Sequence, residues 1–169
     1  MKLASFEAIV RALHEYRVLY LIAGGMAVSA HGYVRFTKDV DLVLQLLPAN
    51  ILRAFAALAP LGYKPIIPVT PEQFADPATR ESWVRDKNMM VLQLWSDTHR
   101  ETPIDLFAAE PFNFDDEYEH ALIKPLYGQI AVRFVSVRTL LVMKQNAGRD
   151  QDKIDVEQLR LLMTDDDRE

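Results

Sequence analysis

The sequence contains no cysteine, which excludes disulfide bonds, thiolate metal sites and a cysteine nucleophile. It has no apolar run long enough to span a membrane, and an acid at Glu7 interrupts the N-terminus before the apolar core of a signal peptide could form. An excess of basic residues is also absent, because the formal net charge is −5, and this argues against tight electrostatic binding to bulk nucleic acid. We therefore expect a cytoplasmic protein with no membrane association.

The 169 residues are enough for one domain with a sizeable core and too few for two comfortable ones. The most informative stretch begins at Gly24-Gly25, which follows the apolar run 18–23 and opens a short predicted helix. A second apolar run follows, with Asp39 and Asp41 near its start. Because the side chains of a strand alternate between its two faces, both carboxylates are expected to leave the same face.

This combination of residues favours phosphate chemistry. Two like charges this close raise each other's pKa, a divalent cation relieves the repulsion, and hard cations such as Mg²⁺ choose carboxylate oxygens. A glycine turn at a helix N-terminus offers backbone N–H groups and a positive dipole end to a phosphate. Each piece alone has a simpler interpretation, because Asp39 and Asp41 could form a solvated strand face and Gly24-Gly25 could be an ordinary turn.

Two further charged residues lie in apolar surroundings. Asp105 lies within a predicted strand of otherwise apolar residues, and a charge is rarely placed there without a partner. The alternative is an edge position that points Asp105 to water. Lys144 follows the apolar spacing of the helix predicted after Ser136. It either contacts a nucleotide phosphate or, together with Arg149, braces Asp152 and Asp155 across a helix pair.

The remaining pattern predicts an α/β (α+β) fold with a mixed sheet and helices mainly on one side, as a single domain over 1–169 with a C-terminal helix pair at about 136–163. The predicted helices are one capped by Ser5, one at 26–31, one from Asn50 to Leu58, a short irregular one at 72–86, one at 112–123 and the final pair. The predicted strands are 18–23, the run that begins at Asp39, 89–95, 104–107 and 129–135, with 63–71 as an edge strand or a loop. We expect 164–169 to form a solvated tail.

The order of these motifs resembles the nucleotidyltransferase superfamily, the fold of the DNA polymerase beta catalytic domain. In particular, it is similar to the small prokaryotic nucleotidyltransferases related to the AbiEii-type toxins and to the aminoglycoside and lincosamide nucleotidyltransferases. The similarity rests on Gly24-Gly25 followed by Arg35-x-Thr37-x-Asp39-x-Asp41. The run 143–155 resembles the tail of the same proteins. The resemblance departs at Gly25, where many members have a serine whose hydroxyl contacts phosphate.

The resemblance implies a metal-dependent nucleotidyltransferase that moves a nucleoside monophosphate from an NTP to an acceptor hydroxyl. The catalytic and metal-binding residues are then Asp39, Asp41 and Asp105, with Mg²⁺ or Mn²⁺ as cofactor, and Asp105 also helps to activate the acceptor hydroxyl. The nucleotide-binding residues are Gly24, Gly25, Arg35, Lys38 and Lys144. For Arg35 and Lys38, a solvated surface position is the alternative.

The acceptor stays open at the level of the sequence, because tRNA, a protein and a small molecule all fit. A tRNA or protein acceptor would suit a toxin-antitoxin system with a protein partner. A small-molecule acceptor would suit a drug-modifying enzyme. A third alternative is a catalytically reduced module of the same fold that binds a nucleotide or a partner protein.

Overall fold

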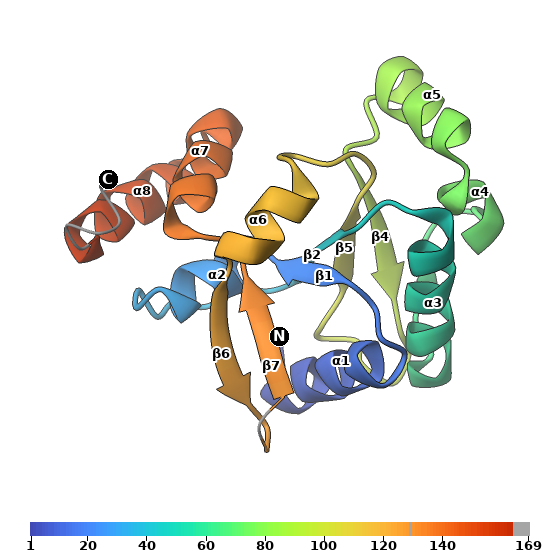
Figure 1. Cartoon of the computed structure of the whole chain (residues 1–169), viewed down its shortest axis with the longest axis horizontal. Helices are drawn as coiled ribbons and strands as arrows, with labels where there is room; N and C mark the ends of the chain where they lie inside the picture. Colours follow the sequence, from blue (N-terminus) through green and yellow to red (C-terminus); the bar gives the residue numbers. More distant parts are fainter. Residues whose placement is uncertain (129, 164–169) are drawn as a thin grey trace.

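The computed structural model describes residues 1–128 and 130–163, and a mixed sheet of seven strands forms its centre (Figure 1). The strands are β1 (Tyr20–Ile22), β2 (Val40–Leu44), β3 (Lys64–Pro65), β4 (Val91–Trp95), β5 (Ile104–Phe107), β6 (Leu122–Leu126) and β7 (Ile130–Phe134). They are arranged in the order β3-β4-β5-β2-β1-β7-β6. β1 pairs in parallel with β7 and β2 in parallel with β5, whereas the other neighbours are antiparallel. The predicted mixed sheet is therefore confirmed.

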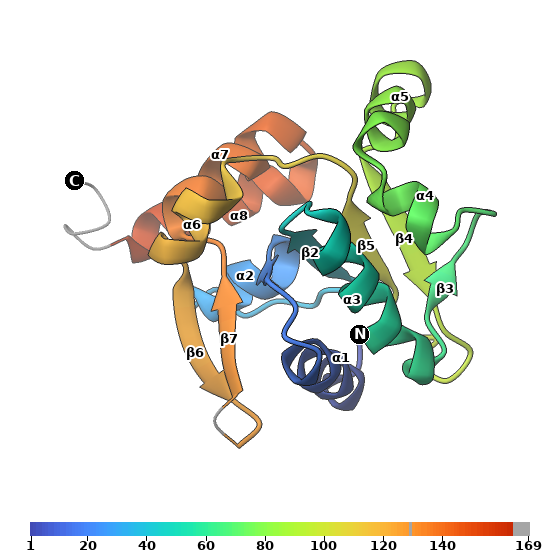
Figure 2. The same ribbon diagram turned by 45° about the vertical axis from the view of Figure 1, so that its right-hand side comes forward.

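The described residues also form helices. They are α1 (Leu3–Glu15), α2 (Gly24–Ala30), α3 (Pro48–Leu58), α4 (Pro71–Ala75), α5 (Pro77–Lys87), α6 (Phe114–His120), α7 (Val137–Ala147) and α8 (Asp150–Leu162), with a 3₁₀ turn at Ala59–Leu61. α1 packs beside α3 (Figure 2) and fully buries Phe6, Ile9, Val10 and Leu13, as their helical spacing predicts. No helix in the described part of the chain is long and apolar enough to cross a membrane.

Two of the predicted helix starts are wrong. α1 begins at Leu3, so Ser5 lies inside it, buried, with its hydroxyl 2.9 Å from His99 Nδ1. α3 begins at Pro48, so Asn50 lies inside it, and its side chain bonds the backbone N–H and carbonyl of Leu19, both at 2.9 Å. In both cases a side chain typical of a helix cap makes a polar contact with a distant segment instead.

Other differences concern the middle of the chain. The segment predicted as one helix at 72–86 forms α4 and α5, separated by Asp76, which caps α5. The segment predicted as helical at 112–123 ends as α6 at His120 and is followed by β6. The short strand β3 lies at a sheet edge, in line with one of the two alternatives for 63–71. Residue 129 of the predicted strand and the predicted tail at 164–169 lie outside the described residues.

The elements that carry the motifs meet at one end of the sheet. Because β1 and β7 run opposite to β2 and β5, the ends of the first two lie beside the starts of the other two. α2 follows β1 directly, and α7 follows β7 and packs against both α2 and α8 (Figure 2). Ser136 caps α7 as predicted, because its hydroxyl accepts a hydrogen bond from the Thr139 N–H at 3.3 Å.

Candidate active site

Asp41 and Asp105 lie opposite each other on the neighbouring parallel strands β2 and β5. Paired residues of adjacent strands point to the same face, so both carboxylates leave one face of the sheet. Asp39 lies two residues before Asp41, just before β2 begins, and its charge acts on both of the others. The structure thus brings the three carboxylates together. Because β5 lies between β4 and β2, the edge alternative for Asp105 is wrong.

Asp41 and Asp105 are partly buried, and the pKa of each is raised. Burial is the largest cause that raises the pKa of Asp41 to about 7, and the charges of Asp39 and Asp105 act in the same direction. Burial also raises the pKa of Asp105, although a hydrogen bond from Gln93 Nε2 at 2.9 Å works against it. The cluster therefore carries negative charge that its surroundings do not fully compensate, and a cation would relieve this.

Gly24 brings the glycine turn into direct contact with this cluster. Its φ is +60°, a left-handed conformation that glycine adopts readily and other residues do not. A Cβ at this residue would lie 1.7 Å from Asp41 Oδ2, which is far inside any contact distance. Only glycine therefore permits both the backbone conformation and the position of the Asp41 carboxylate.

Gly25 is required for a different reason, because it is not among the glycines with a positive φ. A Cβ at this residue would lie 2.5 Å from Thr37 Oγ1 and 3.2 Å from Arg35 Nη1. The side chains of Thr37 and Arg35 thus cover the first turn of α2. Sequence reasoning did not single out Thr37 as a site residue, although the alternating spacing Thr37-x-Asp39-x-Asp41 was a signal for it.

Two of the predicted phosphate-binding cations are part of an internal network. Arg35 donates to Asp155 from Nε at 2.7 Å and from Nη2 at 2.8 Å. Lys144 is 5% exposed, and its Nζ lies 2.8 Å from Asp152 and 2.9 Å from Asp155. The bracing interpretation of Lys144 is therefore realised, and its contact with a phosphate stays a prediction. Lys38, the third cation, is exposed.

Arg149 is a further cation close to the cluster. Its Nε donates to Asp152 Oδ2 at 2.7 Å, yet its side chain is 76% exposed. The hydrogen bond to Asp152 is the largest cause that raises the pKa of Arg149, and the charges of Asp41 and Asp39 add to it. The guanidinium therefore lies within electrostatic reach of both carboxylates. Sequence reasoning treated Arg149 only as a brace, because its neighbours in the chain offered nearby partners.

The carboxylate cluster fits a divalent cation only in part. In residues 1–128 and 130–163, no group of three or more His, Cys, Asp or Glu side chains is arranged so that it could hold a metal ion. A cation at Asp39, Asp41 and Asp105 would therefore need ligands from outside the protein. Magnesium sites that bind nucleotides commonly use one or two carboxylates and complete the shell with phosphate oxygens and water, so the donor set matches a cation that arrives with a nucleotide.

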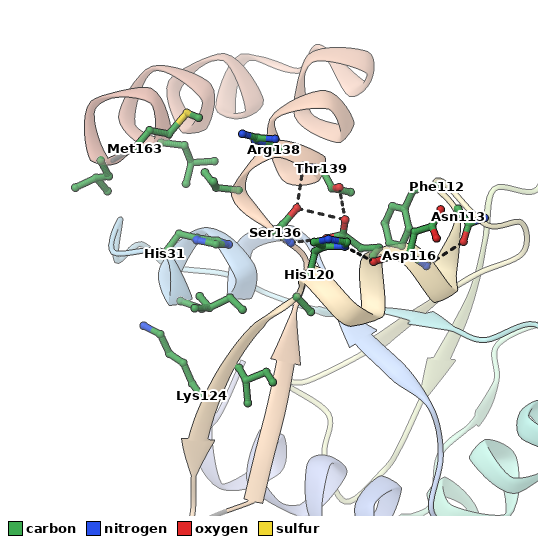
Figure 3. A pocket seen from close by; sticks show the side chains of 18 residues that line it. His31, Phe112, Asn113, Asp116, His120, Lys124, Ser136, Arg138, Thr139 and Met163 are labelled. Atoms are coloured by element: carbon green, nitrogen blue, oxygen red, sulfur yellow. Dashed lines mark hydrogen bonds between the residues drawn. The ribbon is translucent and has the colours of Figure 1, made fainter. Parts of the chain in front are cut away.

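A separate cavity of about 1150 Å³ lies between α6, the start of α7 and the end of α8 (Figure 3). Its lining includes His31 and His120 and none of the three carboxylates of the cluster. At its wall the buried Glu117 accepts hydrogen bonds from the Ser136 N–H and the Thr139 hydroxyl. Glu117 therefore provides hydrogen-bond acceptors for polar groups at the start of α7. The candidate active site is therefore assigned from the chemistry of its residues, and its carboxylates do not line this cavity.

Several solved nucleotidyltransferase structures share this fold. The lincosamide antibiotic adenylyltransferase LnuA, bound to lincomycin, gives a TM-score of 0.60 at 12% identity and covers 96% of this chain and 99% of its own. ANT(2″)-Ia in complex with adenylyl-2″-tobramycin gives 0.56 at 13%, with 92% and 85% covered. An antigenic nucleotidyltransferase-like protein from Paracoccidioides brasiliensis gives 0.54 at 16%, with 90% and 71% covered. At these identities the likeness shows the fold.

The sequence comparisons identify the family. No curated protein matches the chain. A family model described as "Nucleotidyltransferase of unknown function (DUF6036)" matches residues 2–166, which is nearly the whole chain, and the resemblance to the nucleotidyltransferase superfamily is confirmed. The chain therefore belongs to this DUF6036 family, and it is a nucleotidyltransferase.

Proposed function

We propose that the protein transfers a nucleoside monophosphate from an NTP to an acceptor hydroxyl and releases pyrophosphate, with a divalent cation bound at Asp39, Asp41 and Asp105. The observation that carries the proposal is the register of Asp41 opposite Asp105 on one face of β2 and β5. The pKa of Asp41, raised mainly by burial to about 7, supports it. A carboxylate in this environment needs a nearby cation to be fully ionised at neutral pH.

Each residue of the cluster has a role in this proposal. Asp39 and Asp41 are the principal cation ligands, and the bound cation, Mg²⁺ or Mn²⁺, would stabilise negative charge on the transferred phosphoryl group. Asp105 assists them and accepts the proton of the acceptor hydroxyl. Burial raises the pKa of Asp105, which moves this carboxylate towards the range in which a general base works best at neutral pH.

The phosphates of the nucleotide would lie over the glycine turn. Gly24 and Gly25 carry no side chain, so Asp41, Thr37 and Arg35 approach the backbone of the turn closely. The phosphates would contact these groups together with the turn. Lys38 reaches the phosphates from its exposed place on the loop. Lys144 contributes positive charge from within the helix pair, because its charge lowers the pKa of Asp41 while its ammonium group bonds two carboxylates.

The test is a labelling experiment. The purified protein is incubated with each of the four α-³²P-labelled NTPs, with Mg²⁺, Mn²⁺ or EDTA, in the presence of a cell extract. We expect a labelled product that depends on the cation and disappears in Asp41→Asn and Asp105→Asn. Asp86→Asn is the matched control, because Asp86 is exposed on α5 and pairs with Arg85. Nucleotide binding without any transfer would favour the catalytically reduced module instead.

The identity of the labelled species then assigns the acceptor. LnuA and ANT(2″)-Ia are solved with an antibiotic or an adenylylated antibiotic, so lincosamides and aminoglycosides belong in the screen. Label on tRNA or on a protein would indicate a toxin of a toxin-antitoxin system, and label on an added antibiotic would indicate a drug-modifying enzyme.

A further inference from the structure

Thr37 places its side chain where residue 25 has none. A Cβ built on Gly25 would lie 2.5 Å from Thr37 Oγ1, 2.8 Å from Thr37 Cβ and 3.2 Å from Arg35 Nη1. Non-bonded heavy atoms do not approach this closely without strain, so the bare Cα of Gly25 is what admits the two side chains. The hydroxyl and the guanidinium therefore converge on the first turn of α2, beside Gly24, against which the Asp41 carboxylate lies.

The Thr37 hydroxyl is fixed in position but weakly used. Thr37 is 8% exposed, and its carbonyl accepts a hydrogen bond from the amino group of Met1 at 3.2 Å. Its hydroxyl donates to the Asp39 carbonyl at 3.4 Å. This distance is longer than the usual O–H···O distance of about 2.5–3.0 Å. A stronger acceptor, such as a phosphate oxygen, would therefore compete readily for this proton.

Arg35 is held in the same way. Its Nε and Nη2 bond Asp155, and its Nη1 donates to the Phe36 carbonyl at 2.9 Å. A guanidinium has five N–H groups, and these three bonds leave a second N–H on Nη1. Thus one hydroxyl and one guanidinium nitrogen, both fixed by other contacts, lie together over Gly25. Charge-assisted hydrogen bonds to an anion are the strongest that such donors make.

We propose that Thr37 is a nucleotide-binding residue whose hydroxyl donates to a phosphate oxygen over Gly25, next to Arg35 Nη1. This inference rests on the proposed function and adds a specific donor atom to it. Gly25 and Thr37 act as a pair in this arrangement, because residue 25 must lack a side chain for the hydroxyl of residue 37 to reach the turn. A hydroxyl at residue 25 itself and the hydroxyl of Thr37 would then exclude each other.

The first experiment isolates the hydroxyl. Thr37→Val keeps the branched shape and replaces the hydroxyl by a methyl group, whereas Thr37→Ser keeps the hydroxyl and removes the methyl group. The probe is inorganic tripolyphosphate with Mg²⁺, measured by calorimetry, because it carries the phosphates without a base; the four NTPs are measured alongside. We expect Thr37→Val to weaken binding about tenfold or more, whereas Thr37→Ser should bind within about twofold of wild type. The unfolding midpoint of Thr37→Val should stay close to that of wild type.

The second experiment moves the hydroxyl to the other residue of the pair. Gly25→Ser alone is expected to lower the unfolding midpoint, since its Cβ would meet Thr37 Oγ1 and Cβ. Combined with Thr37→Gly, which removes both atoms, Gly25→Ser should fold better than alone. The double variant should also bind tripolyphosphate more tightly than Thr37→Gly. If Thr37→Val does not fold, Thr37→Ser against Thr37→Ala gives the same comparison, because those two variants differ only in the hydroxyl.

The outcomes separate this inference from the function on which it rests. One outcome is that the wild-type protein binds tripolyphosphate or an NTP and the variant without the hydroxyl binds it with the same affinity. This outcome overturns the role of Thr37 and leaves the proposed function standing. In that case Thr37 only fills the space above Gly25. Failure of the wild-type protein to bind either probe in the presence of Mg²⁺ overturns both.

Discussion

Asp155 accepts two hydrogen bonds from Arg35, one from Nε at 2.7 Å and one from Nη2 at 2.8 Å, and so joins α8 to the loop that precedes β2. Asp155 is fully buried and also pairs with Lys144. Lys144 continues the network to Asp152, which holds Arg149. Removing one partner of a buried ion pair leaves an uncompensated charge, which is costly. The network therefore holds the C-terminal helix pair in place against the glycine turn.

Arg35→Ala is expected to destabilise the protein by about 3 kcal/mol. It removes both hydrogen bonds from Arg35 to a carboxylate that has no access to water. Lys144 and Gln151 remain bonded to Asp155, but they do not replace the two lost bonds. Urea unfolding measures the change. Arg85→Ala is the matched control, since the Arg85–Asp86 pair is exposed on both sides and such pairs contribute about 1 kcal/mol or less. Equal effects of the two substitutions would contradict a supporting role for the buried pair.

Asp41→Asn is expected to stabilise the cation-free protein while it abolishes transfer. The amide keeps the shape of the side chain and removes a charge that burial and two neighbouring carboxylates oppose. The gain is up to about 4 kcal/mol at pH 8. Thermal unfolding with and without Mg²⁺ plus nucleotide measures both effects. A variant that keeps the wild-type stabilisation by these ligands would show that Asp41 is not a cation ligand.

The same pKa predicts how pH changes the stability of the wild-type protein in EDTA. The pKa of Asp41 rises on folding from 3.8 to about 7, so between these values the folded protein binds a proton that the unfolded chain releases. The contribution of Asp41 to stability therefore falls as pH rises through this window. Urea midpoints at pH 5 and pH 8 should differ less in Asp41→Asn than in wild type. An identical difference would place the titration on another group.

Gly24→Ala is expected to destabilise the protein more than Gly148→Ala. Both glycines have a positive φ, +60° and +65°, and the backbone penalty of about 1–2 kcal/mol is therefore shared. Only at Gly24 does the new methyl group meet Asp41 Oδ2, at 1.7 Å, whereas at Gly148 the nearest atom is 3.7 Å away. The excess of about 1–3 kcal/mol measures the crowding by Asp41. Equal unfolding energies would contradict this contact.

Arg149→Gln is expected to weaken the binding of Mg²⁺–tripolyphosphate about tenfold, with little loss of stability. The exposed guanidinium lies within electrostatic reach of Asp41 and Asp39, and Asp152 keeps its bond from Lys144 when Arg149 is replaced. Lys153→Gln is the control, because Lys153 is also exposed on α8 and its ammonium group pairs with Asp150 of the same helix. Equal affinities in both variants would remove Arg149 from the nucleotide site.

Local patterns were enough to predict the strands that carry the candidate site. The apolar run after Asp39, the interruption of another apolar run by Asp105 and the capping residue Ser136 each have a local physical cause, and each matches the structure. β6 was missed because Lys124 and Pro125 obscure its alternation. A proline is tolerated there, since β6 lies at the edge of the sheet.

What the sequence could not predict depends on contacts between distant segments. The pairing of Arg35 with Asp155 spans 120 residues, and no local signal selects this partner over other acids. The contact of Thr37 with Gly25 likewise exists only once the loop has folded over α2. Ser5 and Asn50 were misread for the same reason, because their side chains bond distant partners that outweigh the local preference for a helix cap.

The position of β2 has a consequence for the synthesis of the chain. β2 lies between β1 and β5, but β5 begins only at Ile104, long after β2 ends at Leu44. At about 5–20 residues per second, the ribosome needs roughly 3–12 s to add the intervening residues. During that interval one edge of an apolar strand has no partner, and such an edge is a template for aggregation. The yield of folded protein in a cell should therefore depend on how well chaperones shelter the nascent chain at this stage.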